Sequence, residues 1–406
     1  MRHLNLRLYE DIVGPCEIEE ILDLVKRLKG ISVVHVNSTS KGGGVAEILR
    51  SIVSLFNLVG IDCRWEVIEG TEKFFRTTKL FHNLLQAIPS RRKESITEDM
   101  LKEYIKVNQR NIKKIDLTSD VVIIHDPQPA ALIEARKNNK NNKWIWRCHI
   151  DLSNPDRKVW DFLSTYIKKY DAAIFSMQEF VQPLPFTCYI IPPSIDPLSE
   201  KNRELSTSQI KDILRRMEIY PQKPILLQVS RFDYFKDPVG VIKVYRRVKK
   251  RVDCQLILAG GEARDDPEGP EVLKQIRREA KDDPDIHILN LAPDSFVQIN
   301  ALQRSADVVI QKSLREGFGL TVTEALWKAR PVVGGNVGGI RLQIKEGENG
   351  FLVNSVEEAA DRVEYLLRNP LCARKMGEVG RKIVKEKFLI TRHLKDYLRL
   401  IKSICR

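Results

Sequence analysis

The chain has 406 residues, of which 43% are hydrophobic, and a formal net charge of +13 at pH 7. This length exceeds the size at which a single hydrophobic core stops growing, so we expect two domains. No apolar run approaches the roughly 18 residues of a membrane span, and the N-terminal stretch lacks the apolar region of a signal peptide. The seven cysteines are scattered, without a C-x-x-C pair, which indicates the reduced thiols of a cytoplasmic protein.

The positive charge is interspersed with negative charge along the predicted helices, as in "RREAKDDPD" and "RKMGEVGRKIVKEK". A nucleic-acid-binding protein usually gathers its basic residues on one face or in one tract. No arginine-glycine tract, zinc knuckle or aromatic RNA-binding signature accompanies the charge here. We therefore expect no nucleic-acid partner, and a positive field that attracts a small anionic substrate such as a nucleotide.

The first half of the chain alternates strands and helices after a helical prelude that ends at Gly30. Its short apolar runs lack polar alternation, which is typical of strands buried on both faces of a parallel sheet. The predicted strands cover residues 32–38, 63–69, 121–126, 143–150, 172–177 and 188–193. Helical patterns lie between them, including residues 45–58 and the charged stretch 95–114.

The segment 192–209 interrupts this rhythm with proline, serine and charged residues, and it predicts a domain junction. A second alternating series follows, with predicted strands at residues 224–230, 254–260, 286–291, 307–313, 331–335 and 350–354. We therefore expect two doubly wound, Rossmann-like α/β domains at 1–193 and 194–384. Residues 385–406 would form a C-terminal helix that packs back on the first domain.

The segment "REGFGLTVTEALWKARPVVGG" (315–335) is predicted to pass from a strand through a loop into a helix. The backbone amides at the start of that helix can hold a phosphate. Two glutamates flank the turn with seven residues between them. Glu316 lies in the loop, where it can meet sugar hydroxyls, and Glu324 lies on the helix. The alternative is that both are solvated surface acids.

The segment "VSRFDYFKDP" (229–238) follows the first strand of the second domain and carries Arg231 and Lys236. Arginine offers a fork of donors and lysine a point charge, and together they can clamp a diphosphate. An ordinary basic loop is the alternative.

In the first domain, two predicted strands end in histidine and aspartate. "IIHDPQPA" carries His125 and Asp126, and "WRCHIDLS" carries His149 and Asp151. A lone histidine at a strand end is more often structural than catalytic. Because two strand ends carry this pair, a polar substrate pocket is as well supported as a purely structural role for these residues.

Three glycines, residues 42–44, separate the first predicted strand from the helix after it. The dinucleotide fingerprint G-x-G-x-x-G requires a small residue where Glu47 stands, and no G-K-[ST] phosphate loop follows. Asp62 lies where the ribose-binding acid of such a fingerprint is expected, so spacing alone leaves a nicotinamide cofactor open.

Taken together, these motifs resemble those of the retaining GT-B glycosyltransferases of family 4, over essentially the whole chain. The E-x7-E pair of Glu316 and Glu324 is specific for the broad family. Other stretches are similar to the subgroup that joins a nucleotide-activated glucose to free glucose to form trehalose: "NSTSKGGGVAEILRS", "HDPQPAALIEA", "WRCHIDLS" and "SLREGFGLTVTEALWKARPVVGGNVGGI". The resemblance implies a GT-B fold with two Rossmann-like domains facing a deep cleft.

The resemblance also implies roles for individual residues. Arg231 and Lys236 would hold the donor diphosphate, Glu316 would bind hydroxyls of the transferred glucose, and His149 would lie near its 6-hydroxyl. The catalytic set would be Arg231, Lys236, Glu316, His149 and Asp126. The donor-binding set adds Gly43, Gly44, Gly319, Leu320, Thr321 and Glu324, the last on the ribose. The acceptor-binding set is Asp126, Gln128, His149 and Asp151. Asp237 departs from the family, where glycine is common after the lysine.

The reaction expected from the resemblance is transfer of glucose from UDP-, ADP- or GDP-glucose to glucose, with retention at the transferred carbon. We expect no required cofactor and no metal site, with magnesium at most a stimulant. We find no Asp-x-Asp metal signature at a strand end of the donor domain, which agrees with a metal-independent reaction. The substrates would be the partners, together with a second copy of the chain in a homodimer. The alternatives are another acceptor, such as a sugar phosphate, glycerate or glycan, and a nucleotide-sugar binding protein without turnover.

Overall fold

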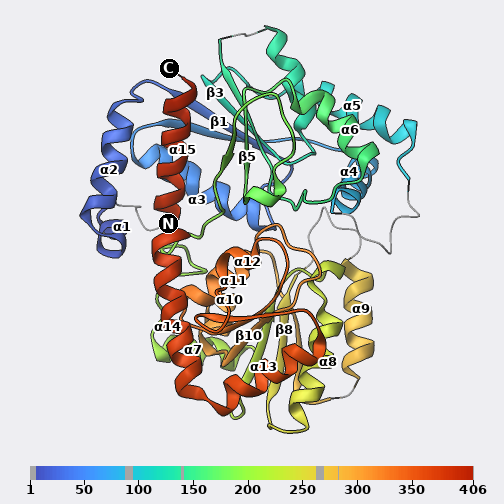
Figure 1. Ribbon diagram of the computed structural model, residues 1–406, viewed down its shortest axis with the longest axis vertical. Coiled ribbons are helices and arrows are strands. Elements are labelled where there is room, and N and C mark those ends of the chain that lie inside the picture. The colour runs from blue at the N-terminus through green and yellow to red at the C-terminus, as the bar shows by residue number, and fades with distance from the viewer. Residues whose placement is uncertain (1–5, 87–94, 139–140, 262–268, 282, 406) are drawn as a thin grey trace. The chain divides into compact units, whose positions relative to one another are not determined.

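The computed structural model describes residues 6–86, 95–138, 141–261, 269–281 and 283–405. It divides into two compact units: Met1–Pro193 together with Ile390–Arg406, and Ser194–Leu389. Each unit is built on one six-stranded sheet in which neighbouring strands run parallel, with helices on both faces (Figure 1). All twelve strands expected from the sequence are present, which confirms the predicted α/β fold class.

The first unit carries a sheet of order β2-β1-β3-β4-β5-β6. Its elements are α1 (Leu6–Val13), α2 (Pro15–Lys26), β1 (Ser32–Asn37), α3 (Gly44–Leu58), β2 (Asp62–Val67), α4 (Glu72–Leu85), α5 (Glu98–Ile112), β3 (Val121–His125), η2 (Ala130–Asn138), β4 (Lys143–Arg147), α6 (Arg157–Ile167), β5 (Ala172–Phe175), η3 (Gln178–Phe180), β6 (Cys188–Ile190) and α15 (Ile390–Ile404).

The two faces of this sheet differ in chemistry. One face buries Val36, Ile124 and Trp146 in a hydrophobic cluster with residues of α4, α5 and α6. Side chains alternate between faces along a strand, so the neighbouring positions His35 and His125 point to the opposite face. This second face is therefore apolar in part and carries buried histidines.

The second unit carries a sheet of order β12-β11-β10-β7-β8-β9. Its elements are α7 (Thr207–Arg216), β7 (Ile225–Val229), η4 (Tyr234–Lys236), α8 (Pro238–Lys249), β8 (Gln255–Gly260), α9 (Gly269–Ala280), β9 (Ile286–Asn290), α10 (Phe296–Ser305), β10 (Val308–Gln311), α11 (Leu320–Trp327), β11 (Val332–Gly335), α12 (Ile340–Gln343), β12 (Gly350–Val353), α13 (Val356–Arg368) and α14 (Pro370–Lys387).

In each sheet the chain reverses the direction in which it adds strands. The second unit begins at β7, adds β8 and β9 on one side, and then places β10 on the other side of β7. The first unit begins at β1, adds β2, and then places β3 on the other side of β1. Open α/β sheets bind ligands beyond the carboxyl ends of their strands at such switch points. The loops after β7 and β10, and those after β1 and β3, are thus the places to look for sites.

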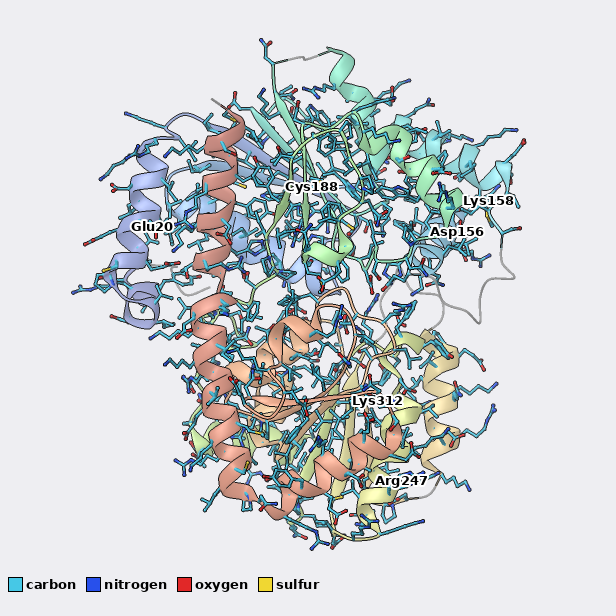
Figure 2. The ribbon with its side chains drawn as sticks, in the orientation of Figure 1. Glu20, Asp156, Lys158, Cys188, Arg247 and Lys312 are labelled. Carbon is cyan, nitrogen blue, oxygen red and sulfur yellow. The ribbon has the colours of Figure 1, made fainter. Side chains whose placement is uncertain are left out.

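The C-terminal boundary differs from the expected one. A break after residue 384 would fall inside α14, which continues to Lys387 and packs along α11 of the second unit. The chain changes units only between Leu389 and Ile390. From there α15 packs against α2 and α3, and Glu20 of α2, labelled in Figure 2, pairs with Lys395 and Arg399 of α15.

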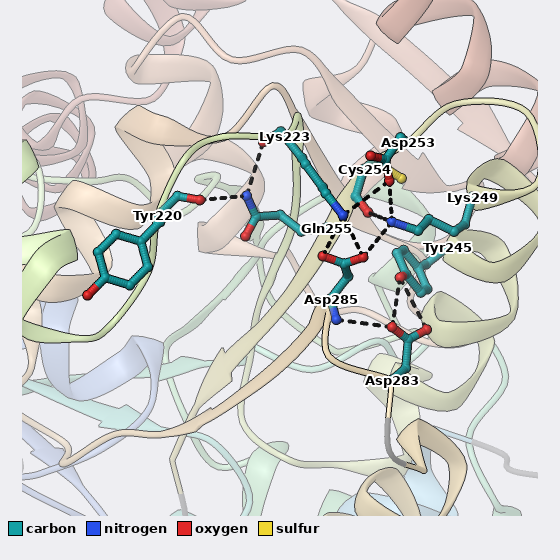
Figure 3. Close-up of polar contacts among 9 residues, drawn as sticks. All are labelled: Tyr220, Lys223, Tyr245, Lys249, Asp253, Cys254, Gln255, Asp283 and Asp285. Carbon is teal, nitrogen blue, oxygen red and sulfur yellow. Dashed lines mark hydrogen bonds and ion pairs between the residues drawn. The ribbon is translucent and has the colours of Figure 1, made fainter.

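A polar network joins the amino-terminal ends of β8 and β9 to α8 (Figure 3). Asp285 accepts hydrogen bonds from Lys249 Nζ at 2.6 Å and Lys223 Nζ at 2.9 Å. Asp283 accepts one from the Tyr245 hydroxyl at 3.2 Å. Asp283 and Asp285 form an Asp-x-Asp pair directly before β9, at the amino-terminal end of that strand. Both carboxylates are bound by basic or hydroxyl side chains, and they lie at the end of the sheet opposite to the switch point.

None of the helices in the described ranges is long and apolar enough to cross a membrane. All seven cysteines are free thiols, as expected from their scattered positions.

Candidate active site

The loops that follow β7 and β10 meet at the switch point of the second unit, and Lys236 and Glu316 link them. Lys236 Nζ donates to Glu316 Oε2 at 2.6 Å, and the Ser313 hydroxyl donates to the same oxygen at 3.1 Å. Oε1 of Glu316 makes no hydrogen bond to the part of the chain that the structure describes. A lysine ammonium has three donors, so Lys236 keeps two for another acceptor. The pair therefore presents both a cationic donor and a free carboxylate oxygen.

Two further contacts hold the same loops together. Lys312 Nζ, labelled in Figure 2, lies 2.5 Å from Asp237 Oδ2, and the Leu314 amide donates to the Phe235 carbonyl at 2.7 Å. Asp237 has φ of 48° and caps α8 by accepting from the Gly240 amide at 3.0 Å. A left-handed residue at this place suits glycine, which agrees with the family pattern, and here the aspartate charge is balanced by Lys312.

Arg231 lies in the same loop after β7. Its side chain is one-third exposed (34%), and Nη2 is 3.6 Å from Oδ2 of the buried Asp233. The other carboxylate oxygen of Asp233 accepts from the Phe235 amide at 2.8 Å. Asp233 thus shapes the loop and lies beside the partly exposed side chain of Arg231.

The helix α11 begins next to this pair. Gly319, its N-cap, has φ of 86°, and a Cβ there would come within 3.2 Å of Glu316 Cγ. Only glycine fits both the backbone and the space. No side chain caps this end, and Leu320 and Thr321 are half-buried. Their amides lie at the positive end of the helix, where a phosphate is stabilised.

Glu324 is almost fully buried, with 1% of its surface exposed, and Glu316 is 7% exposed. The alternative of solvated surface acids is therefore wrong for both. Glu324 Oε2 accepts from Gln303 Nε2 at 3.0 Å, and Oε1 lies 2.9 Å from Lys201 Nζ. Binding of the donor ribose by Glu324 stays a prediction. The ribose hydroxyls would donate to carboxylate oxygens that already accept from Gln303 and Lys201.

In the first unit Asp126 follows β3 with φ of 65°. Its Oδ1 accepts from the His149 amide at 2.7 Å, which joins the loops after β3 and β4. Oδ2 makes no hydrogen bond within the described ranges. Burial raises the pKa of Asp126 to about 7, against the opposing effects of the His149 amide and the Arg147 guanidinium. The carboxyl group therefore titrates near neutral pH.

His149 is half-buried and its ring is held from one side. Its Nε2 lies 2.9 Å from His125 Nδ1, and His125 Nε2 lies 2.9 Å from His35 Nδ1. Burial, together with the nearby Arg147 guanidinium, holds the pKa of His149 well below its usual value. His149 is thus a neutral imidazole at physiological pH.

The other predicted acceptor residues differ in accessibility. The Gln128 side chain is half-buried, and its Oε1 atom is itself buried without a hydrogen-bond partner among the described residues. Asp151 is buried (3% exposed), and its Oδ1 accepts from the Ser153 amide at 2.9 Å. The geometry favours Gln128 over Asp151 as a ligand of a hydroxyl group.

The glycine loop lies between β1 and α3. Gly43 has φ of 81° and is the N-cap of α3, and Gly44 is the first helical residue. A Cβ at Gly43 would meet nothing within 4 Å. The loop therefore needs glycine for its backbone conformation and leaves open space where a ligand could approach.

Sequence reasoning missed several residues around these sites. Lys312, Ser313 and Lys201 hold the two glutamates or their loop, and His35 extends the histidine contacts into the sheet. Lys312 and Ser313 follow β10 directly, so their position at a strand end was an available signal. His35 lies inside a strand and gave none. In the described ranges, no three His, Cys, Asp or Glu side chains are grouped to hold a metal ion.

Comparison with known proteins agrees with the fold described above. The solved structure of an α,α-trehalose-phosphate synthase (UDP-forming) from Burkholderia xenovorans in complex with glucose-6-phosphate superposes with a TM-score of 0.76 over 92% of this chain and 100% of the other, at 13% identity. A model described as "Glycosyl transferases group 1" matches residues 209–383. The fold and the matched domain define a GT-B glycosyltransferase.

The family follows from the whole chain. A model described as "Trehalose synthase, N-terminal domain" matches residues 35–182. The chain is 49% identical to a trehalose synthase of Pyrococcus horikoshii over 98% of this chain and 96% of the relative. It is 50% identical to one of Thermococcus litoralis over 98% and 97%. The chain belongs to the trehalose synthase family and is a glycosyltransferase enzyme.

Proposed function

We propose that the protein transfers glucose from a nucleoside diphosphate glucose to the anomeric hydroxyl of free glucose, with retention, to form α,α-trehalose. The contact between Lys236 and Glu316 carries this proposal. It joins two loops at a switch point and leaves two ammonium donors and one carboxylate oxygen available. The ammonium donors can bind a diphosphate, and the carboxylate oxygen can accept a hydrogen bond from a sugar hydroxyl.

In the proposed reaction the bond from the glucose anomeric carbon to the β-phosphate oxygen breaks. A bond from the same carbon to the acceptor oxygen forms on the same face, and the acceptor proton passes to the departing phosphate oxygen. Charge builds on that phosphate, and Arg231, Lys236 and the amides at the start of α11 would stabilise it. These fixed positive groups are the reason why we propose a metal-independent reaction.

The residues of the first unit support a neutral acceptor. Within the described ranges Asp126 Oδ2 accepts no hydrogen bond, and the buried Oε1 of Gln128 has no partner. Carboxylate and amide oxygens accept hydrogen bonds from sugar hydroxyls, whereas a phosphorylated acceptor would call for basic side chains. Glucose therefore fits these groups better than a sugar phosphate or glycerate.

The test is a product assay. The protein is incubated with UDP-, ADP- or GDP-glucose and glucose, and the product is digested with trehalase, with glucose 6-phosphate and glycerate as parallel acceptors. We expect a trehalase-sensitive disaccharide with glucose. Transfer only to another acceptor would leave the glycosyltransferase class standing and overturn the choice of glucose. Donor binding without any transfer would favour a nucleotide-sugar binding protein.

A further inference from the structure

Three histidines of the first unit form one line of ring-to-ring contacts. His149 Nε2 lies 2.9 Å from His125 Nδ1, and His125 Nε2 lies 2.9 Å from His35 Nδ1. The ring planes of His125 and His149 are nearly parallel, with an interplanar angle of 14°. Each contact uses a nitrogen of both rings, so the line is continuous from His35 to His149.

The strand register explains why these residues meet. His35 of β1 pairs with Ile123 of β3, and His125 lies two residues further along the same strand. His125 in turn pairs with Arg147 of β4, and His149 lies two residues beyond it. A step of two keeps a side chain on the same face. The three imidazoles therefore lie along a diagonal on one face of the sheet, and the line runs toward the carboxyl ends of the strands.

The line is buried except at its outer end. His35 is fully buried (0% exposed) and His125 nearly so (2%), while His149 is half-buried. The aromatic rings of Phe56 on α3 and Tyr397 on α15 pack against His35. Burial lowers the pKa of His35 to about 3 and holds that of His125 well below its usual value. All three rings are thus neutral at physiological pH, and each carries one N–H and one lone pair.

Neutral rings in a line allow only two arrangements of protons. His125 uses both nitrogens, so it donates to one neighbour and accepts from the other. If it donates toward His35, all three rings carry the proton on Nε2, and His35 buries an N–H with no partner among the described residues. If it donates toward His149, all three carry the proton on Nδ1, and His35 buries only a lone pair. Buried N–H groups without a partner are the rarer case in proteins, which favours the second arrangement.

We infer that His125, supported by His35, is a positioning residue that fixes His149 as the Nδ1–H form and aims this N–H at a hydroxyl of the transferred sugar. Nδ1 of His149 is the outer nitrogen and makes no hydrogen bond within the described ranges. The inference rests on the proposed function, because the sugar is the proposed partner of His149.

The physical benefit is preorganisation. A free imidazole rotates and exchanges its proton between two nitrogens, so it offers a donor or an acceptor at different moments. The contact with His125 fixes ring orientation on one side, while the His149 amide bound by Asp126 at 2.7 Å fixes the backbone. A donor held in place costs less reorganisation when the sugar binds.

Nitrogen-15 NMR of protein labelled only at its seven histidines tests the proton positions directly. We expect the resonances of His35, His125 and His149 to report Nδ1–H, with couplings across both ring-to-ring hydrogen bonds. Each resonance is assigned from the spectrum in which that histidine is replaced. A His149 resonance that reports Nε2–H in the unmodified protein would overturn the inference.

The His125→Leu variant tests the effect on transfer. It removes the partner of His149, so we expect a mixture of His149 tautomers and a fall in kcat of about tenfold, the effect of losing roughly one oriented hydrogen bond. The KM for the nucleotide sugar should change little, because the diphosphate ligands belong to the second unit. The control is His287→Leu, a half-buried histidine on β9 of the second unit that lies outside the line. This control should keep the His149 tautomer and most of kcat.

The outcomes separate the inference from the proposed function. Mixed His149 tautomers in the unmodified enzyme, together with normal trehalose formation, would overturn the inference alone. Equal losses in the His125 and His287 variants would also overturn it, because they would show a general effect of replacing a histidine. Absence of transfer to any sugar would overturn both proposals.

Discussion

Lys236 Nζ and Glu316 Oε2 lie 2.6 Å apart although eighty residues separate them in the chain. One residue follows β7 and the other follows β10, and these strands are neighbours only because the chain reverses direction around β7. The contact therefore marks the switch point of the sheet. It brings the predicted phosphate ligand and the predicted sugar ligand into one site.

Replacing Lys236 or Arg231 by alanine should lower turnover by about 100-fold or more, because each removes a fixed positive group from the proposed leaving phosphate. The measurement is kcat with saturating donor and acceptor, alongside thermal unfolding. The control is Lys345→Ala, which removes an exposed lysine of the same unit that pairs with Glu348. Turnover near that of the unmodified enzyme in either site variant would contradict the phosphate clamp.

Replacing Glu316 by glutamine should also lower kcat by about 100-fold, since the change keeps the size but removes the charge that holds Lys236 and the sugar hydroxyl. Because the two residues touch, the double variant Lys236→Ala with Glu316→Gln should lose less than the sum of the single losses. Steady-state kinetics of all four proteins measure this coupling. Additive losses would mean that the two residues act independently.

The affinity for the acceptor should depend on pH through Asp126. Burial raises the pKa of this carboxyl group to about 7, so the fraction of carboxylate grows as the pH rises through 7. A carboxylate accepts a hydrogen bond from a sugar hydroxyl more strongly than a protonated acid does. The KM for glucose should therefore fall between pH 6 and 8 while the KM for the donor stays level. The Asp126→Asn variant should show no such trend, and a persistent trend would assign the pH dependence to another group.

The glycine loop can be tested with a matched pair of variants. Gly43 and Gly60 both have positive φ, 81° and 91°, and a Cβ at either would meet nothing within 4 Å. Valine at each position imposes similar backbone strain. We expect Gly43→Val to lower kcat with little change in nucleotide affinity, and Gly60→Val to lower stability alone. Weakened nucleotide binding with unchanged kcat in Gly43→Val would return the loop to a nucleotide-binding role.

The network at the amino-terminal ends of β8 and β9 should contribute to stability and not to catalysis. Asp285 is 22% exposed and pairs with two lysines, whereas Asp253 is 66% exposed. The hydrogen bonds from Lys249 and Lys223 lower the pKa of Asp285. Asp285→Asn should reduce the free energy of unfolding at pH 7 by about 1 kcal/mol, and Asp253→Asn by less.

The pH dependence of this network has a defined sign. A carboxylate with a lowered folded pKa stabilises the protein above its unfolded pKa, near 4, and this contribution disappears as the pH falls through the folded value. The difference in unfolding free energy between the unmodified protein and Asp285→Asn should therefore shrink below pH 4. Urea unfolding at pH 7 and pH 3 measures it, and an unchanged difference would exclude the ion pairs as its cause.

Most of the local structure could be read from the sequence, because buried parallel strands are short apolar runs and their ends are marked by polar or glycine-rich loops. The E-x7-E spacing and the basic loop after the first strand of the second unit were visible in the same way. The end of the second unit was less visible. The helix α14 continues past residue 384 without a break in its pattern, so only packing showed where the chain leaves that unit.

The sequence by itself determined which chemical groups stand at each strand end: Arg231 and Lys236, Glu316, Asp126 and His149. The tertiary structure decided which of them meet. Strand order and register depend on contacts between distant parts of the chain, so no local pattern reveals that β10 lies beside β7. The same cause hid His35, which in the sequence is a polar residue inside an apolar strand. Only the register of β1, β3 and β4 places it in line with His125 and His149.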